Sequence, residues 1–506
     1  MINLHLWSSV GKYWYLPVAI LFGFLFIMLG AQLGPMIALA LVIAMVALCF
    51  VIAQPGLGLL AIVALTPIER FGRLTDDDSQ VTISIIRFTG LAVLGVLVLH
   101  RMLGRQVFRV DKGFVLYFGY LAMALLSITY TTDSFGTLRA AGAILGNLMF
   151  YFLVTNLTSN HTQIRQCLIV WLTVSVGIAI YSTYDWHFWH GTLELAATPD
   201  EFDRGKGVQT TQSRWSTVWA DQTERAFLGG LSLRRSMGST SHAAVYGINL
   251  ILTIPFLFVM LRLYRRWWQQ GVIYLALGLV AYNCLLTNTR AVILLAALVV
   301  FYAIYRGLYR IYLIQIYIAL LFIPFLYFLV PKDVTNRILD LQNYTFDKSA
   351  SLQIRLDYFM AGARAFLDHW LIGSGVSNQN VIPAYLISRF DAPEQTTVHN
   401  EYLQTLVEVG LVGAFFQFGF VILLLVYNSR TIRILARHAS YATELMIANA
   451  IRVAMMAVLV YGIQVDVLHF PLKGWWLLAG FTVVMYGLAQ EIEQKNTSLN
   501  TQGERT

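Results

Sequence analysis

The sequence predicts an all-α integral membrane protein with about 12–14 transmembrane helices. Of the 506 residues, 58% are hydrophobic and only 12% are charged, whereas globular domains carry about 25% charged residues. The apolar residues also stand in long blocks, as membrane-spanning helices require. Between these blocks lie two long hydrophilic segments, 185–241 and 331–400. This arrangement excludes a soluble multi-domain protein.

About 14 apolar blocks are candidate helices, with an uncertainty of about two. The first half of the chain contributes 13–30, 34–53, 56–66, 85–101, 113–130, 137–156 and 166–184. The second half contributes 242–261, 271–287, 291–306, 311–330, 402–427, 446–465 and 473–490. The block 56–66 is too short to cross alone. Because Pro55, Gly56 and Gly58 interrupt the chain there, we expect a bent continuation of the preceding helix.

Basic residues in the short loops indicate the orientation. If the N-terminus is cytoplasmic, every short loop rich in Lys or Arg falls on the cytoplasmic side, which is the positive-inside pattern. These loops carry Arg101, Arg105, Arg109 and Lys112; Arg262, Arg265 and Arg266; Arg306 and Arg310; and Arg430, Arg433 and Arg437. The same alternation places both long hydrophilic segments outside, in the periplasm of a bacterium. The net charge of +8 is thus explained by loop placement, and no basic face suits nucleic acid.

This topology divides the chain into six parts. They are N-terminal transmembrane helices (1–184), a periplasmic loop (185–241), further transmembrane helices (242–330), a second periplasmic segment (331–400), C-terminal transmembrane helices (401–490) and a disordered cytoplasmic tail (491–506). The first apolar block is followed almost at once by the next, which predicts a retained anchor rather than a cleaved signal peptide. Cys49, Cys167 and Cys284 stand singly in apolar blocks, and we expect them to be buried.

The second periplasmic segment contains a helical pattern. Between Ser349 and Trp370, apolar side chains recur at helical spacing, at Leu352, Leu356, Phe359, Met360, Ala363 and Phe366. The stretch is too polar to span the membrane, so it predicts an amphipathic helix lying over the bundle. Arg355, Asp357 and Arg364 are among its polar positions, and Gly373-Ser374-Gly375 follows.

A polar stretch, which starts at Thr396 and contains His399, then leads into a long apolar helix. Glu401, Gln404 and Glu408 are three and four residues apart, so they share one face of that helix. Polar groups at the head of a membrane helix are costly unless they face protein or a wet cavity. This face therefore predicts a site. If Thr397 caps the helix, His399 occupies its first turn.

The pattern His-Asn-x-Tyr-Leu-x-x-Leu-x-Glu-x-Gly-Leu-x-Gly occupies residues 399–413. It resembles the signature of the O-antigen ligase and O-antigen and exopolysaccharide polymerase superfamily of bacterial membrane glycosyltransferases. The family layout has an arginine, a Gly-x-Gly and then this pattern. The chain resembles it in the same order, with Arg355, Gly373-x-Gly375 and residues 399–413. The resemblance is close over about 285–300 and 350–415. It implies a GT-C-like fold in the inner membrane and a donor glycan on undecaprenyl diphosphate.

Three arginines are expected to bind the diphosphate. Guanidinium groups stay charged and grip phosphate oxygens with paired donors, and Arg290, Arg355 and Arg235 lie where helices meet periplasmic segments. The family shows Ser-Arg where this chain has Thr289 and Arg290. The alternatives are an interface anchor for Arg290 and a solvated helix face for Arg355. Arg235 belongs to a loosely matched stretch in which Ser239 or Thr240 equally predicts a helix cap.

His399 is the expected general base. The positive end of the helix dipole disfavours imidazolium, so the ring stays neutral and accepts a proton from an acceptor hydroxyl. The alternative is a histidine that only hydrogen-bonds a loop. We expect Asn400 to orient backbone or sugar, and Glu401 to hold the ring or the acceptor. The resemblance implies an inverting reaction without metal or cofactor.

Three other acidic or histidine-bearing stretches are candidate sites. Asp76-Asp77-Asp78 is interpreted as a solvated loop rather than a Mg²⁺ site. The stretch 185–190 allows an Asp/His metal site, although an aromatic belt at the lipid headgroups is the preferred interpretation. Asp466 and His469 flank a short periplasmic turn and receive no role.

The acceptor stays open at this point. Lipid A–core would make the protein an O-antigen ligase, which is favoured because the His-Asn-x-Tyr-Leu form matches that branch. Another lipid-linked glycan would make it a polymerase of O-antigen, capsule or exopolysaccharide, and a protein side chain an O-oligosaccharyltransferase. The rival from another class is a polysaccharide transporter or flippase. Such proteins show pseudo-symmetric halves and helices broken at the midplane, whereas here the polar residues gather at one face of the membrane.

Overall fold

The computed structural model describes residues 51, 54–68, 85–188, 223–228, 231–240, 242–310, 350–378, 381–386, 397–465 and 472–503. Several expectations lie outside the described residues. They concern the helices 13–30 and 311–330 and most of 34–53, together with Cys49, Asp76-Asp77-Asp78, Trp189, His190, Asp466 and His469.

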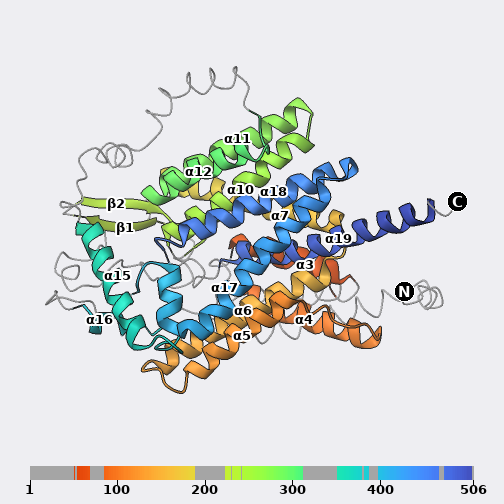
Figure 1. The fold of residues 1–506 in the computed structure, drawn as a ribbon. Helices are drawn as coiled ribbons and strands as arrows, with labels where there is room; N and C mark the ends of the chain where they lie inside the picture. The colour runs from red at the N-terminus through yellow and green to blue at the C-terminus, as the bar shows by residue number, and fades with distance from the viewer. Residues whose placement is uncertain are drawn as a thin grey trace, which may run out of the picture.

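Helices form nearly all of the described chain and run back and forth through one bundle (Figure 1). Seven are long and apolar enough to cross a membrane: α4 (Ile85–Leu103), α6 (Ser134–Leu157), α7 (His161–Phe188), α10 (Ala243–Leu263), α11 (Trp267–Leu286), α17 (Glu401–Leu435), and η5 with α18 (Ala439–Tyr461). Shorter apolar helices are α3 with η2 (Pro55–Ile68), α5 (Lys112–Ser127) and α12 (Arg290–Tyr305), and α19 (Lys473–Gly503) runs through the bundle beside α17. The expected all-α membrane class is confirmed.

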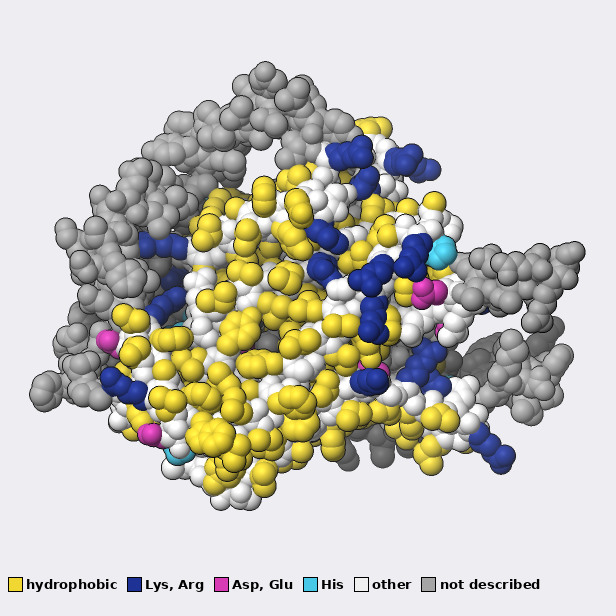
Figure 2. Space-filling view, viewed as in Figure 1, with side chains coloured by type: hydrophobic (Ala, Val, Ile, Leu, Met, Phe, Trp, Pro, Cys, Tyr) yellow, Lys and Arg dark blue, Asp and Glu magenta, His cyan; other side chains and the backbone are white. Residues whose placement is uncertain are grey.

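The outer surface of the bundle is apolar across its middle. Large side chains such as Leu294, Phe301 and Phe415 are mostly exposed, and Figure 2 shows hydrophobic side chains covering the centre of the face in view. Lys and Arg side chains gather mainly toward the end that bears the C-terminus (Figures 1 and 2). This belt is the surface that lipid tails would cover.

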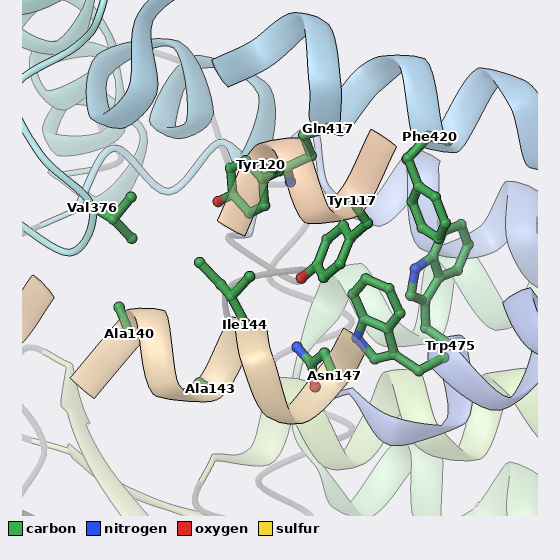
Figure 3. Close-up of a pocket in the computed structure, with 12 residues that line it drawn as sticks. Tyr117, Tyr120, Ala140, Ala143, Ile144, Asn147, Val376, Gln417, Phe420 and Trp475 are labelled. Atoms are coloured by element: carbon green, nitrogen blue, oxygen red, sulfur yellow. The ribbon is translucent and has the colours of Figure 1, made fainter. Parts of the chain in front are cut away.

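A small cavity of about 40 Å³ lies inside the bundle between α5, α6, α17 and α19. Figure 3 shows Tyr117 and Asn147 turned toward one another at its centre, with Gln417 and Trp475 on other walls. A cavity needs about 10–15 Å³ of such volume to hold a water molecule. The volume and the polar lining therefore suit one or a few waters.

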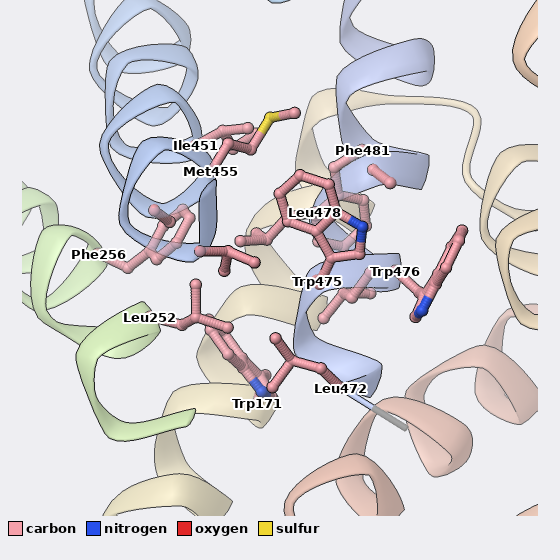
Figure 4. Close-up of a cluster of buried hydrophobic side chains, with 14 of the residues drawn as sticks. Trp171, Leu252, Phe256, Ile451, Met455, Leu472, Trp475, Trp476, Leu478 and Phe481 are labelled. Atoms are coloured by element: carbon pink, nitrogen blue, oxygen red, sulfur yellow. The ribbon is translucent and has the colours of Figure 1, made fainter. Parts of the chain in front are cut away.

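The core is packed by large side chains from α7, α10, α18 and α19. Figure 4 shows Trp171, Phe256, Met455 and Trp475 packed within one cluster. The rings of Trp171 and Phe256 meet edge to face, with centroids 5.8 Å apart. Helix α10 is apolar on all sides and almost entirely buried, as expected for a helix enclosed by others.

The described chain also contains a two-stranded hairpin, whose second strand contacts α10 and α11. Strands β1 (Thr223–Leu228) and β2 (Leu231–Ser236) pair antiparallel, with Thr223 opposite Ser236. The hairpin lies at the same end of the bundle as α15 (Ala350–Asp368) and the short α16 (Val381–Ala384) (Figure 1). Helix α15 confirms the helix expected between Ser349 and Trp370, whereas the hairpin was not predicted.

Helix α17 is broken, and the prediction of one continuous helix over 402–427 was wrong in this respect. Gly410 has φ +60° and ψ −166°, which interrupts the helix after its first nine residues. A Cβ at Gly410 would lie 2.4 Å from the carbonyl carbon of Leu371. Glycine is therefore required both by the backbone angle and by the approach of the other segment.

The loop after α15 satisfies the backbone groups that this break releases. In an unbroken helix, the amides of Leu411 and Val412 would donate to the carbonyls of Val407 and Glu408. Instead, those two amides donate to Trp370 O (2.9 Å) and Leu371 O (3.2 Å). Val407 O and Glu408 O accept from the amides of Ser374 (2.8 Å) and Gly375 (2.9 Å). Four bonds between segments thus replace two within the helix.

Candidate active site

A cavity of about 370 Å³ lies at the end of the bundle that carries α15 and the hairpin. Its walls come from α6, β2, the starts of α10, α12 and α17, helix α15 with the segment that follows it, and the end of α18. The lining residues are Ala140, Arg235, His242, Ala244, Thr289, Ala291, Arg355, Ser377, Thr397, His399, Gln404, Glu408, Tyr461, Gln464 and Val465. Segments more than 200 residues apart in sequence therefore meet here.

The cavity wall is positively charged. Arg235 from β2 and Arg355 from α15 both line it, and the charges of both reach the buried Tyr461. Arg290 begins α12. Its neighbours Thr289 and Ala291 line the cavity, but Arg290 itself is not among the lining residues. The structure thus brings two of the three predicted arginines together and leaves the third beside them.

His399 lines the same cavity, immediately before α17. The expectation that Thr397 caps this helix was wrong, because the side chain of Asn400 is the cap and accepts from the amide of Leu403 at 3.0 Å. His399 therefore precedes the helix rather than occupying its first turn. Its φ is +54°, a strained value for a residue with a side chain. Its ring lies 5.8 Å from that of Tyr358, between centroids, and Nδ1 lies 3.4 Å from Thr397 Oγ1.

The His399 ring is open to the cavity but crowded by protein. This desolvation, followed by the charge of Arg355 and then that of His242, lowers the pKa of His399 to about 4. All three causes disfavour the charged imidazolium. The ring is therefore neutral near pH 7, as expected from the sequence, although desolvation and a neighbouring arginine are the causes.

The polar face predicted at the head of α17 is present. Glu401, Gln404 and Glu408 are almost fully buried, and Gln404 and Glu408 line the cavity. Gln404 joins two parts of the site, because its Oε1 accepts from the amide of Val398 at 2.9 Å and its Nε2 donates to Glu408 Oε1 at 2.7 Å. The residue next to His399 is thus tied to a buried carboxylate.

Asn400 and Glu401 lie behind the cavity wall. The Asn400 amide donates to Ile463 O at 2.7 Å, and the Glu401 backbone amide donates to Gly462 O at 2.8 Å. The Glu401 carboxylate accepts from Gln417 Nε2 at 3.3 Å, in the interior of the bundle. Both residues fix the start of α17 against the end of α18, and neither is among the residues that line the cavity.

His242 is a lining residue that the sequence reasoning missed as a site residue. It caps α10, since its Nδ1 accepts from the amide of Ala244 at 3.1 Å. The expected caps, Ser239 and Thr240, instead bond to Pro67 O and to the carbonyls of Met237 and His242. Because Nδ1 accepts, Nε2 is the ring nitrogen that carries a proton. A histidine at the head of a membrane helix was the available signal.

Residues 275–418 match a family model described as O-antigen ligase. This stretch of the chain is similar to the O-antigen ligase family. The resemblance drawn from the sequence is thereby confirmed. No curated protein matches the chain. The matched residues include Arg290, Arg355 and the whole motif from His399 to Gly413, whereas Arg235 and His242 come from outside the match.

The cavity combines complementary groups within one space. Two permanent cations suit an anionic leaving group, a neutral imidazole can accept a proton, and the Gln404–Glu408 pair can hydrogen-bond hydroxyls. Among the described residues, no group of three or more His, Cys, Asp or Glu side chains is arranged to hold a metal ion. In the stretch 185–190, which is expected to form an aromatic belt at the lipid headgroups, the Nε2 atom of His187 lies 2.6 Å from the hydroxyl of Tyr282.

Proposed function

We propose that the protein is a glycosyltransferase of the bacterial inner membrane. It transfers a glycan from undecaprenyl diphosphate to an acceptor hydroxyl on the periplasmic side, and lipid A–core is the favoured acceptor, which makes it an O-antigen ligase. One observation carries this proposal: a neutral His399 shares a cavity with Arg235 and Arg355 in a chain that is similar to the O-antigen ligase family over residues 275–418.

The proposed reaction is a single displacement at the anomeric carbon. The acceptor oxygen attacks that carbon, and His399 takes the hydroxyl proton. The bond between the anomeric carbon and the phosphate oxygen breaks, and undecaprenyl diphosphate leaves with the bonding electrons. Attack opposite the leaving group inverts the anomeric configuration. Arg235 and Arg355 hold the departing charge, with Arg290 joining them from the margin of the cavity.

Donor binding would also make His399 a stronger base. A pKa of about 4 keeps the ring neutral but leaves it weakly basic in the free protein. Arg355 is the second cause of that low pKa. A diphosphate bound to Arg355 offsets its positive field, so the pKa of His399 rises toward the value at which proton transfer is most favourable.

The residues around His399 have supporting roles in this proposal. Asn400 and Gln404 fix the backbone on either side of the base. His242 presents an N–H donor at the cavity wall, suited to a phosphate oxygen. Glu408 is placed to accept from sugar hydroxyls, and Glu401 acts from behind the wall by holding α17 to Gln417.

The alternatives share the same site. A polymerase or an O-oligosaccharyltransferase would use the same base and cations with another acceptor. The transporter reading gains one feature from the break in α17, since broken helices are common in transporters. However, this break lies at the cavity end of the bundle and is braced by the α15–α17 loop, so we favour transfer.

Purified protein in nanodiscs, supplied with lipid-linked glycan, tests the proposal. Separate reactions offer lipid A–core, a second lipid-linked glycan, or an acceptor peptide. We expect glycan on lipid A–core and one undecaprenyl diphosphate released per transfer. If no acceptor is glycosylated, and a deletion strain accumulates donor on the cytoplasmic leaflet, the protein is a flippase instead.

A further inference from the structure

Two arginines lie close together where α12 packs on α18, away from the cavity. Arg306 is the C-cap of α12, and Arg452 lies within α18. Their guanidinium groups are close enough for their charges to repel. Ala291 and Tyr461, on the same two helices, line the active-site cavity. At a rise of 1.5 Å per residue, the arginines lie roughly 22 Å and 14 Å further along these helices, so the pair is separate from the cavity.

Each of these arginines is held by neutral oxygens. Arg306 Nε donates to Asn449 Oδ1 at 3.1 Å, and its Nη2 donates to the same atom. Arg452 Nε donates to Asn428 Oδ1 at 2.9 Å. Its Nη2 donates to Ser429 Oγ and more weakly to Leu425 O. These bonds orient the guanidinium groups without neutralising them.

The two positive charges have no carboxylate partner within the described part of the chain. The ion pairs there join Arg165 with Glu444 and Arg437 with Glu493. A charged side chain in the apolar region of a membrane protein is costly unless it is paired or reaches the interface. Two adjacent cations increase this cost. The pair therefore has a strong electrostatic preference for an anion.

Burial along α18 shows that this pair is accessible from outside the bundle. Asn449 and Arg452 are partly exposed, as are Leu445, Met456 and Leu459, whereas Ala448, Ile451, Met455 and Val458 are buried. The partly exposed positions are three or four residues apart, so they form one outward stripe. Arg306 reaches this stripe from α12, and Asn428 reaches it from α17. The stripe thus lies between two flanking helices.

We propose that Arg306 and Arg452 bind the phosphate of an anionic phospholipid in the cytoplasmic leaflet. Forked guanidinium donors match phosphate oxygens, and basic pockets between transmembrane helices on the cytoplasmic side suit anionic headgroups. The neighbouring loops carry Arg262, Arg265, Arg266 and Arg310, and Arg262 donates to Gly307 O at 2.8 Å, beside Arg306. An anionic lipid satisfies two uncompensated charges, whereas the ammonium group of a zwitterionic lipid would oppose them.

The experiment uses the full chain in nanodiscs of phosphatidylcholine with a minority of phosphatidylglycerol. Native mass spectrometry counts the phosphatidylglycerol retained by wild type and by the Arg306→Gln/Arg452→Gln double variant. The Arg265→Gln/Arg266→Gln variant is the matched control, because it also removes two cations, from the connection between α10 and α11. Charged hydrogen bonds of this kind predict retention about tenfold to a hundredfold weaker in the first variant than in the control.

Three results would overturn the proposal. Equal retention by the double variant and the control would mean that only general surface charge attracts the lipid. Displacement of the lipid by inorganic phosphate would identify a free-anion site. If the double variant melts at a lower temperature both with and without phosphatidylglycerol, and its lipid retention is unchanged, the two arginines only stabilise the packing of the helices. If the glutamine variant does not fold, Arg306→Lys/Arg452→Lys keeps the charges but loses the forks, and its retention must still fall below that of the control.

Discussion

His399 carries the proposed chemistry, and its surroundings set its protonation. Desolvation comes first, followed by Arg355 and His242. The Asn400 cap and the Gln404 bond to the Val398 amide hold the backbone on either side of it. These ties offset the cost of a positive φ, about 1–3 kcal/mol for a non-glycine residue. The site thus stores strain at the one residue whose position matters most.

The pKa of His399 is directly measurable. We expect about 4 in the free protein, and a higher pKa both in Arg355→Gln, which loses the second cause, and in wild type saturated with undecaprenyl diphosphate. Histidine resonances followed by NMR against pH, and assigned with His399→Gln, give these values. A pKa that ignores both the substitution and the ligand would contradict the proposed coupling between Arg355 and His399.

The same pKa has a consequence for stability. The folded value lies below the value of about 6.5 for an unfolded histidine, so the unfolded chain binds more protons. The contribution of His399 to the free energy of unfolding therefore does not change with pH above about pH 6.5. The free energy of unfolding falls as the pH drops from about 6.5 toward about 4.

The arginines test whether geometry or charge binds the diphosphate. We expect Arg355→Lys and Arg290→Lys each to lose most transfer activity while the protein stays folded and inserted, since lysine cannot form the paired contact. Arg364→Lys is the control, because Arg364 is an exposed residue of the same helix as Arg355 and does not line the cavity. Transfer rates in nanodiscs decide the matter. Near wild-type rates in both variants would leave only a simple electrostatic role.

At the scale of the element, the break in α17 is the feature most open to test. The backbone of Gly410 combines a positive φ with an extended ψ, a region that essentially only glycine adopts, so a side chain there costs about 1–3 kcal/mol from the backbone alone. Its Cβ would also press on the backbone of Leu371. We therefore expect Gly410→Ala to lower the thermal unfolding midpoint markedly and to reduce transfer. Gly142→Ala is the matched control, because Gly142 lies in α6 with open space around it. That change should be neutral or stabilise by about 0.5–1 kcal/mol.

Equal unfolding midpoints for the two glycine variants would contradict this account of the break. A lower midpoint with full transfer would instead show that the brace stabilises the fold without shaping the site.

Most of the helices could be predicted from the sequence, because long apolar blocks have few other solutions in a membrane. The break at Gly410 could not, since Gly-Leu-Val-Gly is also compatible with a continuous transmembrane helix. Its cause is the segment 370–375, which is distant in sequence and supplies the replacement hydrogen bonds. The predictions of the helix caps were wrong for a similar reason. Asn400 rather than Thr397 caps α17, because Gly462 and Ile463 fix where that helix begins.

The candidate site was predictable in its residue types and less so in its contacts. The spacing of Glu401, Gln404 and Glu408 correctly indicated a polar face, but only the packing shows which of them reach the cavity. Arg235 and Arg355 were found as candidates because a diphosphate calls for guanidinium groups. Arg235 comes from a hairpin and Arg355 from an amphipathic helix. They line one cavity because of tertiary contacts that no local sequence pattern encodes.

At the scale of the whole molecule, the bundle has two chemically different ends. The cavity lies at one end, and the basic connections after α4, α10, α12 and α17 lie at the other (Figure 1). We expect the cavity end to face the periplasm. On a background without native cysteines, a cysteine at position 355 should label from outside the cell, and cysteines at 105 and 433 should not. The reverse pattern would invert the topology and remove the site from the periplasm.

The most direct test separates donor binding from transfer in His399→Gln and His399→Ala. A positioned general base contributes about 10²–10⁴-fold to rate, so both variants should lose transfer by that factor. Donor affinity should stay near wild type, because the arginines contact the leaving group. Purified proteins in nanodiscs allow both quantities to be measured on one sample. Near-normal transfer by His399→Gln would show that the ring only positions the acceptor, and loss of donor binding in both variants would place His399 in the diphosphate pocket; either result would contradict its role as the base.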